Sequence, residues 1–181
     1  MSHSQDNKCQ TVSWAVGDAP LELGPCIAAI GNFDGVHRGH GKVIEAAIDA
    51  ARKAGVAAAG VTFDPHPREF FRHDDVPFCL ADRIEKDRLL AAAGVDRVIH
   101  VTFDDNLRCT DAAAFVTDIL PAIDVIGLFA GFDFAFGRGR GGDIDTINAR
   151  GADIGITATA VPLLSDENSA VISSSRIRAA L

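Results

Sequence analysis

Short apolar segments alternate with amphipathic helical patterns about five times along the chain, and this alternation constrains the fold more than any other feature. None of the apolar segments shows regular alternation with polar residues, so we expect the sheet to be covered on both faces, as parallel sheets are. The pattern predicts a doubly wound α/β protein with a mainly parallel five-stranded sheet and helices on both faces. Ligands of such proteins bind at the carboxyl ends of the strands. The predicted strands are residues 26–30, 56–63, 97–103, 125–130 and 154–161, with a further short candidate strand around 12–16.

Helix signals fill the intervals between these strands. Residues 40–54 carry an apolar stripe, and Asp82 with Glu85 has the spacing of a capping box at the start of a second helix. A third helix is predicted from Thr110 until Pro121 stops it, because proline removes a backbone donor. Weaker signals predict helices over residues 143–150 and from the serine cluster at 173–175.

Length and composition limit the class of protein. The 181 residues are enough for one domain, which we assign to residues 25–181, after an N-terminal segment 1–24 that carries the short candidate strand. The net charge of −8 argues against a general nucleic-acid binder. No apolar run is long enough to span a membrane, and the first ten residues are polar. The four cysteines form no C-x-x-C pair, so we expect reduced thiols, no zinc ribbon and a cytoplasmic protein.

The most informative segment is residues 31–40, GNFDGVHRGH, between the first sheet strand and the first helix. Gly31 and Gly35 permit a tight turn, and His37 and His40 share one face of the first helical turn. Free N–H groups and the positive end of the helix dipole suit a phosphate there. The same dipole disfavours imidazolium, so both histidines are expected to be neutral donors in the absence of a ligand.

Two other interpretations of this segment stay open on spacing alone. The histidines could be an ordinary solvated pair at a helix start, or they could ligate a metal together with Asp34 and His66.

Two well-known phosphate-binding loop patterns do not fit this sequence. The P-loop pattern fails at Val36 and Val43, and the G-x-G-x-x-G match at residues 137–142 stands too far beyond its strand.

Three further segments follow other strands or close the chain. Residues 62–71, TFDPHPREFF, contain two prolines that we expect to forbid helix and to present His66 at the same sheet edge as His37. Residues 131–140, GFDFAFGRGR, carry alternating phenylalanines, at least one of which we expect to serve packing, and two arginines. Residues 172–178, ISSSRIR, offer hydroxyls that can cap a helix or hold phosphate oxygens.

In this order and spacing, the four segments resemble the adenylyltransferase domain of the prokaryotic FAD synthetases, the bifunctional riboflavin kinase/FMN adenylyltransferases. The resemblance covers residues 27–181. It implies a Rossmann-like nucleotidyltransferase fold and FMN adenylyltransferase activity, with ATP and FMN as substrates and Mg²⁺ carried by the ATP phosphates rather than by dedicated protein ligands. The chain departs from the usual family pattern at Gly41-Lys42, Ala135 and Ser175. It contains no counterpart of the riboflavin kinase part, so conversion of riboflavin to FMN is not expected, whether the chain is a stand-alone enzyme or a truncation.

The resemblance also implies site residues. The catalytic residues would be His37, His40 and Arg178. The ATP-binding set would be Gly31, Phe33, Asp34, Gly35, His37, His40, Ser174, Ser175 and Arg178, and the FMN-binding set would be Asn32, His66, Pro67, Phe71 and Asp133.

The implied reaction needs no general base, because a phosphate monoester is mostly ionised at pH 7. Catalysis would consist of alignment and of stabilising charge on the phosphates, at a polyanion site built from residues 37–40, 138–140 and 176–178. The alternatives are a related nucleotidyltransferase with another nucleotide or acceptor, a catalytically inert flavin- or nucleotide-binding module, and, more distantly, a metal-dependent hydrolase.

Overall fold

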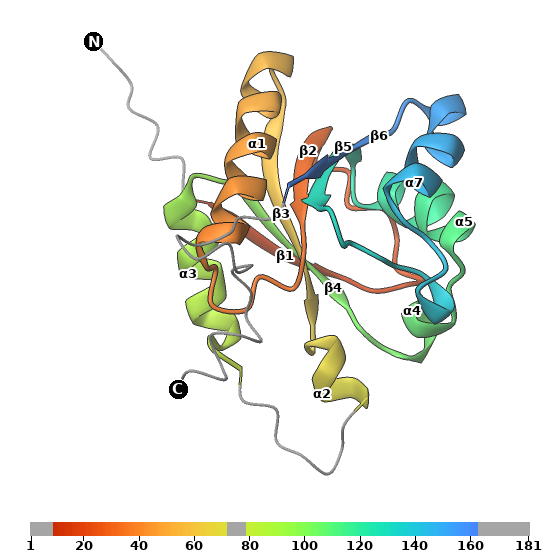
Figure 1. Cartoon of the computed structure of the whole chain (residues 1–181), viewed down its shortest axis with the longest axis horizontal. Coiled ribbons are helices and arrows are strands. Elements are labelled where there is room, and N and C mark those ends of the chain that lie inside the picture. The colour runs from red at the N-terminus through yellow and green to blue at the C-terminus, as the bar shows by residue number, and fades with distance from the viewer. Residues whose placement is uncertain (1–8, 72–78, 163–181) are drawn as a thin grey trace.

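A computed structural model describes residues 9–71 and 79–162 of the chain. Its centre is a single parallel sheet with the strand order β1-β4-β3-β2-β5-β6 (Figure 1). The strands are β1 (Gln10–Trp14), β2 (Cys26–Ile30), β3 (Ala57–Asp64), β4 (Arg97–Thr102), β5 (Val125–Gly131) and β6 (Thr157–Val161). The α/β class and the parallel sheet are therefore confirmed, whereas the expected count of five strands is wrong.

The sixth strand is the short candidate near the N-terminus. β1 pairs in parallel with β4 along its full length, from Gln10 opposite Arg97 to Trp14 opposite Val101. Trp14 is 4% exposed and joins the core, so this segment is fixed by apolar burial as well as by the sheet. β1 thus forms one edge of the sheet within the 1–24 segment.

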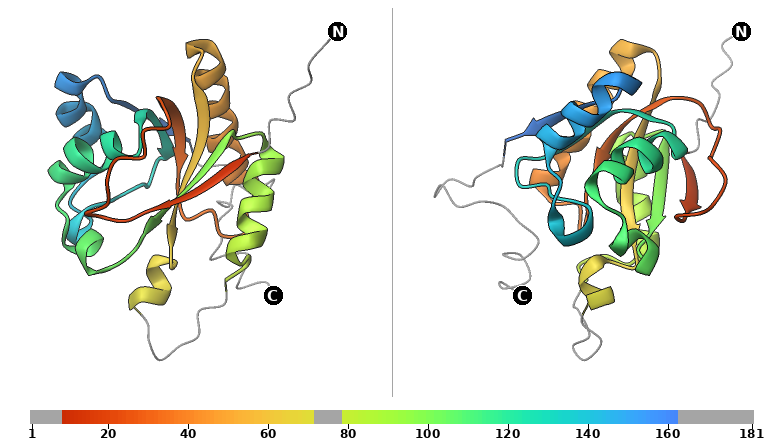
Figure 2. Two further views of the ribbon diagram at one scale, coloured as in Figure 1. Left: turned by 180° about the vertical axis from the view of Figure 1, so that it is seen from behind. Right: turned by 90° about the vertical axis from the view of Figure 1, so that its right-hand side faces the viewer.

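Helices cover both faces of the sheet, as the absence of polar alternation in the strands predicts (Figures 1 and 2). One face carries α1 (Arg38–Ala54) and α3 (Arg83–Ala93), while the other carries the helices between β4 and β5 and the helix before β6. Alternate residues of β2 divide between two cores, with Ala28 and Ile30 on one side and Ala29 on the other. The remaining helices are α2 (Pro67–Phe71), α4 (Asp105–Cys109), α5 (Ala112–Ala114), α6 (Leu120–Ala122), α7 (Ile144–Gly151), the π-helical turn η1 (Phe115–Ile119) and the 3-10 turns η2 (Arg138–Arg140) and η3 (Ala152–Ile154).

Two expectations about proline are wrong. Pro67 does not forbid helix but begins α2, because the first residue of a helix needs no backbone N–H donor. Pro121 does not stop the third helix but lies inside α6, which continues to Ala122. The turn before it is π-helical, with Leu120 N donating to Phe115 O, and this wider pitch accommodates the missing donor at Pro121.

The other helix predictions are confirmed with shifted boundaries. α1 begins two residues earlier than expected, α3 follows its N-cap Asp82, and α7 follows Asp143, whose side chain forms a capping box with Thr146. The last strand starts at Thr157 rather than at residue 154, because η3 and the left-handed Gly155 occupy the intervening turn. The short helices α2 and α4 were not predicted, and the expected helix from the serine cluster at 173–175 lies outside the described residues.

The topology places the carboxyl ends of β3, β2 and β5 side by side. From β2 the chain proceeds outward through β3 to β4, and then returns to add β5 and β6 on the other side of β2. The order therefore reverses beside β2, which is the type of position where doubly wound proteins bind ligands. The segments starting at Gly31, Pro65 and Phe132 all emerge at this edge.

Candidate active site

The segment between β2 and α1 has an unusual backbone. Phe33, Gly35 and Val36 have φ angles of 46°, 75° and 38°, so two non-glycine residues occupy the left-handed region. Each such residue costs of order 1–3 kcal/mol and persists only where the surroundings hold it, as often occurs at ligand sites. Here the Phe33 ring is 1% exposed and packs in the apolar cluster with Val43 and Ile44, so residues 31–36 are anchored from within the core.

Asp34 ties the same segment to the start of α3. Its carboxylate is 2% exposed, and Oδ1 accepts hydrogen bonds from the backbone N–H groups of Leu80, at 2.7 Å, and Ala81, at 3.2 Å. Charge-assisted bonds of this kind are among the stronger ones in proteins. Asp34, which the resemblance assigns to ATP binding, therefore also connects the segment after β2 to the backbone just before α3.

His37 and His40 form a stacked pair at the N-terminus of α1. Their ring centroids lie 3.7 Å apart at an interplanar angle of 18°, and the His40 ring also meets the edge of Phe33 at 5.3 Å. His37 is the N-cap, because its Nδ1 accepts a hydrogen bond of 3.4 Å from the backbone N–H of His40. That acceptor role places the proton of neutral His37 on Nε2.

Both histidines are held neutral, as the sequence predicts, but the main cause is burial rather than the helix dipole. Burial, with the neighbouring His37 and Lys86 charges adding to it and Asp34 opposing it, lowers the pKa of His40 to about 3. Burial also lowers the pKa of His37, against the attraction of Asp34. The His40 Nδ1 atom is buried without a hydrogen-bond partner among the described residues, so Nε2 is the atom through which this ring can meet a ligand.

The segment between β3 and α2 also has a histidine that bonds to the start of the following helix. His66 is 8% exposed, and its Nδ1 accepts a hydrogen bond of 3.0 Å from the backbone N–H of Arg68. The backbone N–H of His66 donates to Glu69 Oε2 at 3.2 Å. The peptide bond between Asp64 and Pro65 is cis. His66 thus caps α2 as His37 caps α1, and both lie after neighbouring strands at one edge of the sheet, as predicted.

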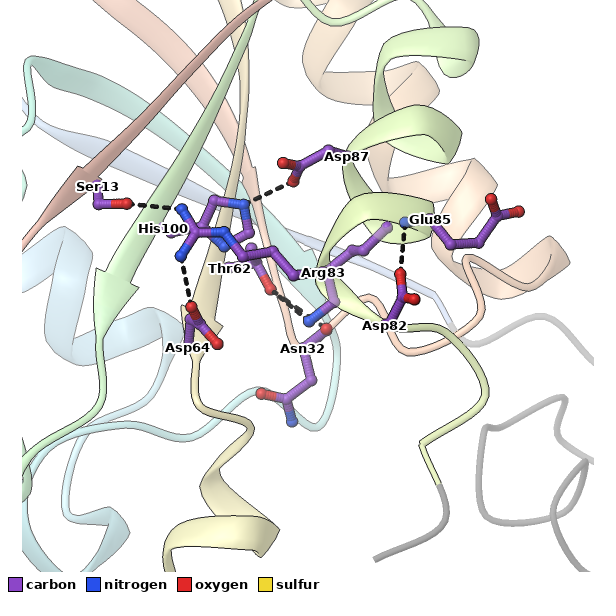
Figure 3. A network of polar contacts seen from close by, with 10 residues as sticks. Ser13, Asn32, Thr62, Asp64, Asp82, Arg83, Glu85, Asp87 and His100 are labelled. Carbon is purple, nitrogen blue, oxygen red and sulfur yellow. Dashed lines mark hydrogen bonds and ion pairs between the residues drawn. The ribbon is translucent and has the colours of Figure 1, made fainter.

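A pocket of about 280 Å³ lies beside this turn. Its floor is a layer of polar side chains between α3 and the sheet, part of which Figure 3 shows. Arg83 bonds to Asp64 at 2.6 Å and to Ser13 at 2.7 Å, and His100 pairs with Asp87 at 2.6 Å. The pocket is lined by Asp34, Asp64, His66, Glu69, Cys79, Ala81, Asp82, Arg83, Lys86 and His100.

Aromatic side chains gather around α2 and after β5. Phe71 is 60% exposed, and its ring contacts Phe70 and Phe103 edge-on with centroids 5.4 and 5.8 Å apart. After β5, Asp133 is exposed and Phe132 is 72% exposed. Phe136, in contrast, is 6% exposed and packs on Phe115 at 4.7 Å, which confirms that at least one of the alternating phenylalanines serves the core.

Two of the three glycines in the dinucleotide-pattern match, Gly137 and Gly142, have a packing role against Ala112. A Cβ on Gly137 would lie 2.8 Å from Ala112 N, and one on Gly142 would lie 2.7 Å from Ala112 Cβ. Arg138 N donates to Thr110 O at 2.7 Å, so this segment is tied to the start of the helix that follows Thr110. The exposed Arg138 and Arg140 extend from this turn.

The structure thus brings together, after β2, β3 and β5, the predicted site residues Gly31, Asn32, Phe33, Asp34, Gly35, His37, His40, His66, Pro67, Phe71 and Asp133. The remaining three, Ser174, Ser175 and Arg178, lie outside the described residues. Sequence reasoning missed the polar floor, above all Lys86, Thr62 and His100. Its only sequence signal was a polar residue within otherwise apolar strands, at Thr62 and His100.

Nowhere in residues 9–71 and 79–162 do three or more His, Cys, Asp or Glu side chains form a group suited to a metal ion. No helix within them has the length and apolar character needed to cross a membrane.

The sheet order and the position of the segment after β2 define a doubly wound α/β protein, a class whose ligands bind at the carboxyl ends of the strands. A sequence profile of the family described as FAD synthetase matches residues 20–176. The chain belongs to the FAD synthetase family.

Relatives agree with this assignment. The chain is 40% identical over 159 residues to the bifunctional riboflavin kinase/FMN adenylyltransferase of Pseudomonas fluorescens, covering 86% of this chain and 50% of the relative. It is 38% identical over 167 residues to the protein of the same name from Escherichia coli strain K12, covering 92% and 52%. The chain therefore spans about half the length of these curated relatives. A crystal structure titled as a macrolide-efflux protein from Streptococcus pneumoniae superposes with a TM-score of 0.82 at 26% identity, covering 94% of this chain and 55% of that one.

Proposed function

We propose that this chain is an FMN adenylyltransferase, which transfers AMP from ATP to FMN and releases FAD and pyrophosphate. The observation that carries the proposal is the convergence of the segments after β2, β3 and β5, with a neutral histidine pair at the N-terminus of the 17-residue helix α1. Membership of the FAD synthetase family supports it. The cytoplasm, where ATP and FMN are available, is the proposed compartment.

The proposed chemistry uses alignment rather than a protein base. The FMN phosphate attacks the α-phosphorus of ATP, a P–O bond forms, and the bond to the pyrophosphate leaving group breaks. Because the second pKa of a phosphate monoester is about 6, the nucleophile is already ionised at neutral pH. ATP enters as its Mg²⁺ complex, with the metal as part of the substrate.

The ATP side of the proposed site is the α1 N-terminus. Nε2–H groups of neutral His37 and His40 donate to phosphate oxygens, and the free N–H groups and positive helix dipole add to the attraction. Negative charge that builds on the α-phosphate and the leaving group strengthens these bonds in the transition state. Gly31, Phe33, Asp34 and Gly35 form the turn that brings the two histidines there, and Ser174, Ser175 and Arg178 complete the proposed ATP set.

The FMN side of the proposed site lies around α2 and the end of β5. Phe71 offers an exposed ring at the end of α2, which suits stacking against a flat aromatic ligand, and His66 with Pro67 forms the turn that begins this helix. Asn32 and Asp133 are exposed polar groups after β2 and β5.

The test is incubation of the purified chain with Mg²⁺, ATP and FMN, followed by chromatographic separation of FAD. We expect FAD and pyrophosphate in equal amounts, and no FMN when riboflavin replaces FMN. Replacing ATP by CTP, or FMN by another phosphorylated acceptor, separates the related nucleotidyltransferases. Binding of ATP and FMN without FAD formation would establish an inert module and refute the proposal.

Replacing Phe71 by alanine is expected to raise the KM for FMN about tenfold, since base–aromatic stacking contributes about 1–3 kcal/mol per contact. The KM for ATP should change little, because the ring lies on the β3–α2 side of the site. Ile154→Ala removes a comparably exposed apolar side chain before β6 and serves as the matched control. An unchanged KM for FMN in Phe71→Ala would remove this residue from the FMN set.

A further inference from the structure

The face of the sheet beneath α3 changes from apolar to polar toward the carboxyl ends of the strands. Leu90 is fully buried over Gly60, where an added Cβ would lie 3.4 Å from the leucine methyl groups. Nearer the site, three in-register residues on β1, β4 and β3 are polar, namely Ser13, His100 and Thr62. Apolar side chains would be enough to dock a helix, so this polar row calls for another explanation.

Lys86 differs from the other charged groups of this layer. Arg83 and His100 each have an acidic partner at 2.6 Å. The side chain of Lys86 is only 7% exposed, and the Thr62 hydroxyl, at 3.4 Å, is the single hydrogen-bond partner of its ammonium among the described residues. A buried charge with so little direct pairing is costly to the fold and therefore points to a task beyond stability.

The electrostatic surroundings of Lys86 come from several elements. Burial lowers its pKa, while the charges of Asp34, Asp64 and Asp87 act in the opposite direction. Asp34 follows β2, Asp64 is the last residue of β3, and Asp87 lies on α3. The ammonium is thus held between the helix and the segment that contains Asp34.

The partner of Lys86 leads directly to that segment. The Thr62 hydroxyl accepts from Lys86 and donates to the backbone oxygen of Asn32 at 3.2 Å. Two residues further, Asp34 is bonded to the backbone just before α3. Residues 31–36 are therefore held at two points, by Thr62 of β3 at Asn32 and by the backbone just before α3 at Asp34. Their left-handed backbone at Phe33 and Val36 needs such support.

We propose that Lys86 is a positioning residue that, through Thr62, fixes the backbone at Asn32 and so places His37 and His40 for phosphate transfer. The inference rests on the proposed function for its kinetic consequences. Lys86 makes no contact with the reacting atoms in this role. Its effect on catalysis is transmitted by the hydrogen bonds to Thr62 and Asn32.

The test combines three variants and one control. Lys86→Met keeps the length of the side chain but removes its charge and donors, and we expect kcat for FAD formation to fall about tenfold or more, since small misplacements of aligned groups are costly. The KM values for ATP and FMN should change by less than about threefold, because the binding groups themselves remain. Arg88→Met removes a charge from the exposed side of the same helix and should behave as the unmodified protein.

Thr62→Val breaks the same connection at its middle, so it should lower kcat similarly, and combining it with Lys86→Met should add little further loss. Thr62→Ser keeps the hydroxyl and should retain activity. Normal kcat in Lys86→Met or Thr62→Val, or fully additive losses in the double variant, would overturn the inference. If Lys86→Met does not fold, the comparison of Thr62→Val with Thr62→Ser decides.

A spectroscopic readout separates this inference from the proposed function. The Lys86 charge contributes to the low pKa of His40, about 3, so Lys86→Met should raise the His40 pKa in an NMR titration without substrates. Amide exchange of residues 31–36 should become faster in the same variant. If the unmodified chain makes no FAD, the proposed function fails, and unchanged His40 titration with unchanged exchange would then refute the inference on its own.

Discussion

Replacing His40 by alanine is expected to lower kcat for FAD formation by about 10²–10³-fold, which is the loss typical of removing one preorganised donor to a developing charge. The affinity for ATP should fall by much less, because in the proposed complex the α1 N-terminus and His37 would still contact the phosphates in the ground state. The measurement is steady-state kinetics together with direct titration of ATP into each variant. An equal loss in kcat and in ATP affinity would refute a role specific to the transition state.

Two controls accompany this variant. His40→Gln can present an amide N–H near the position of Nε2 and should recover part of the lost rate. Because the His40 ring packs against His37 and Phe33, urea unfolding of each variant must show that residues 31–40 keep their fold. Without substrates the pKa of His40 is about 3, so the ring is neutral from pH 5 upward. Activity of the unmodified chain should decline below pH 6, where the FMN phosphate becomes protonated.

Replacing Asp34 by alanine is expected to lower the free energy of unfolding by about 2–4 kcal/mol, since two buried backbone donors lose a charged acceptor. It should also lower kcat about 100-fold, because residues 31–36 lose their connection to the start of α3. Chemical denaturation and the FAD assay measure the two effects. Unchanged stability in Asp34→Ala would show that the segment is held by other contacts.

Asp34→Asn distinguishes the hydrogen bonds from the charge. Both N–H groups are bonded to one oxygen, Oδ1, and an asparagine carbonyl can take its place. We therefore expect Asp34→Asn to keep most of the stability. Asp111→Ala, which removes the N-cap of α5 on the other side of the sheet, should cost about 1 kcal/mol and leave kcat unchanged.

The sheet was predictable because local signals coincide with the elements that formed. Apolar segments without alternation predicted the buried parallel strands, and the capping-box spacing of Asp82 and Glu85 marked a helix start that the structure contains. Local rules failed where tertiary packing or a special turn decided the outcome. Pro67 became the first residue of α2, and Pro121 was accommodated after a π-helical turn.

The histidine pair at the start of α1 shows the same division between what the sequence predicted and what it could not predict. Spacing predicted that His37 and His40 would share a helix face, and in the structure their two rings are stacked. The unusually low pKa of His40 could not be predicted, because it depends on burial against Phe33 and on the distant Lys86. Separations along the chain carry no information about such contacts.

The sequence by itself determined the α/β class, the sheet edge at which the site lies and the family, because hydrophobic periodicity and short motifs are local properties of the chain. Only the tertiary structure decided that β1 joins the sheet, that Asp34 bonds to the backbone before α3, and that Lys86 is buried beneath the site. Each of these depends on residues far apart in sequence that meet when the sheet and helices pack. Their energies are set by desolvation and pairing in the folded chain, which no local pattern encodes.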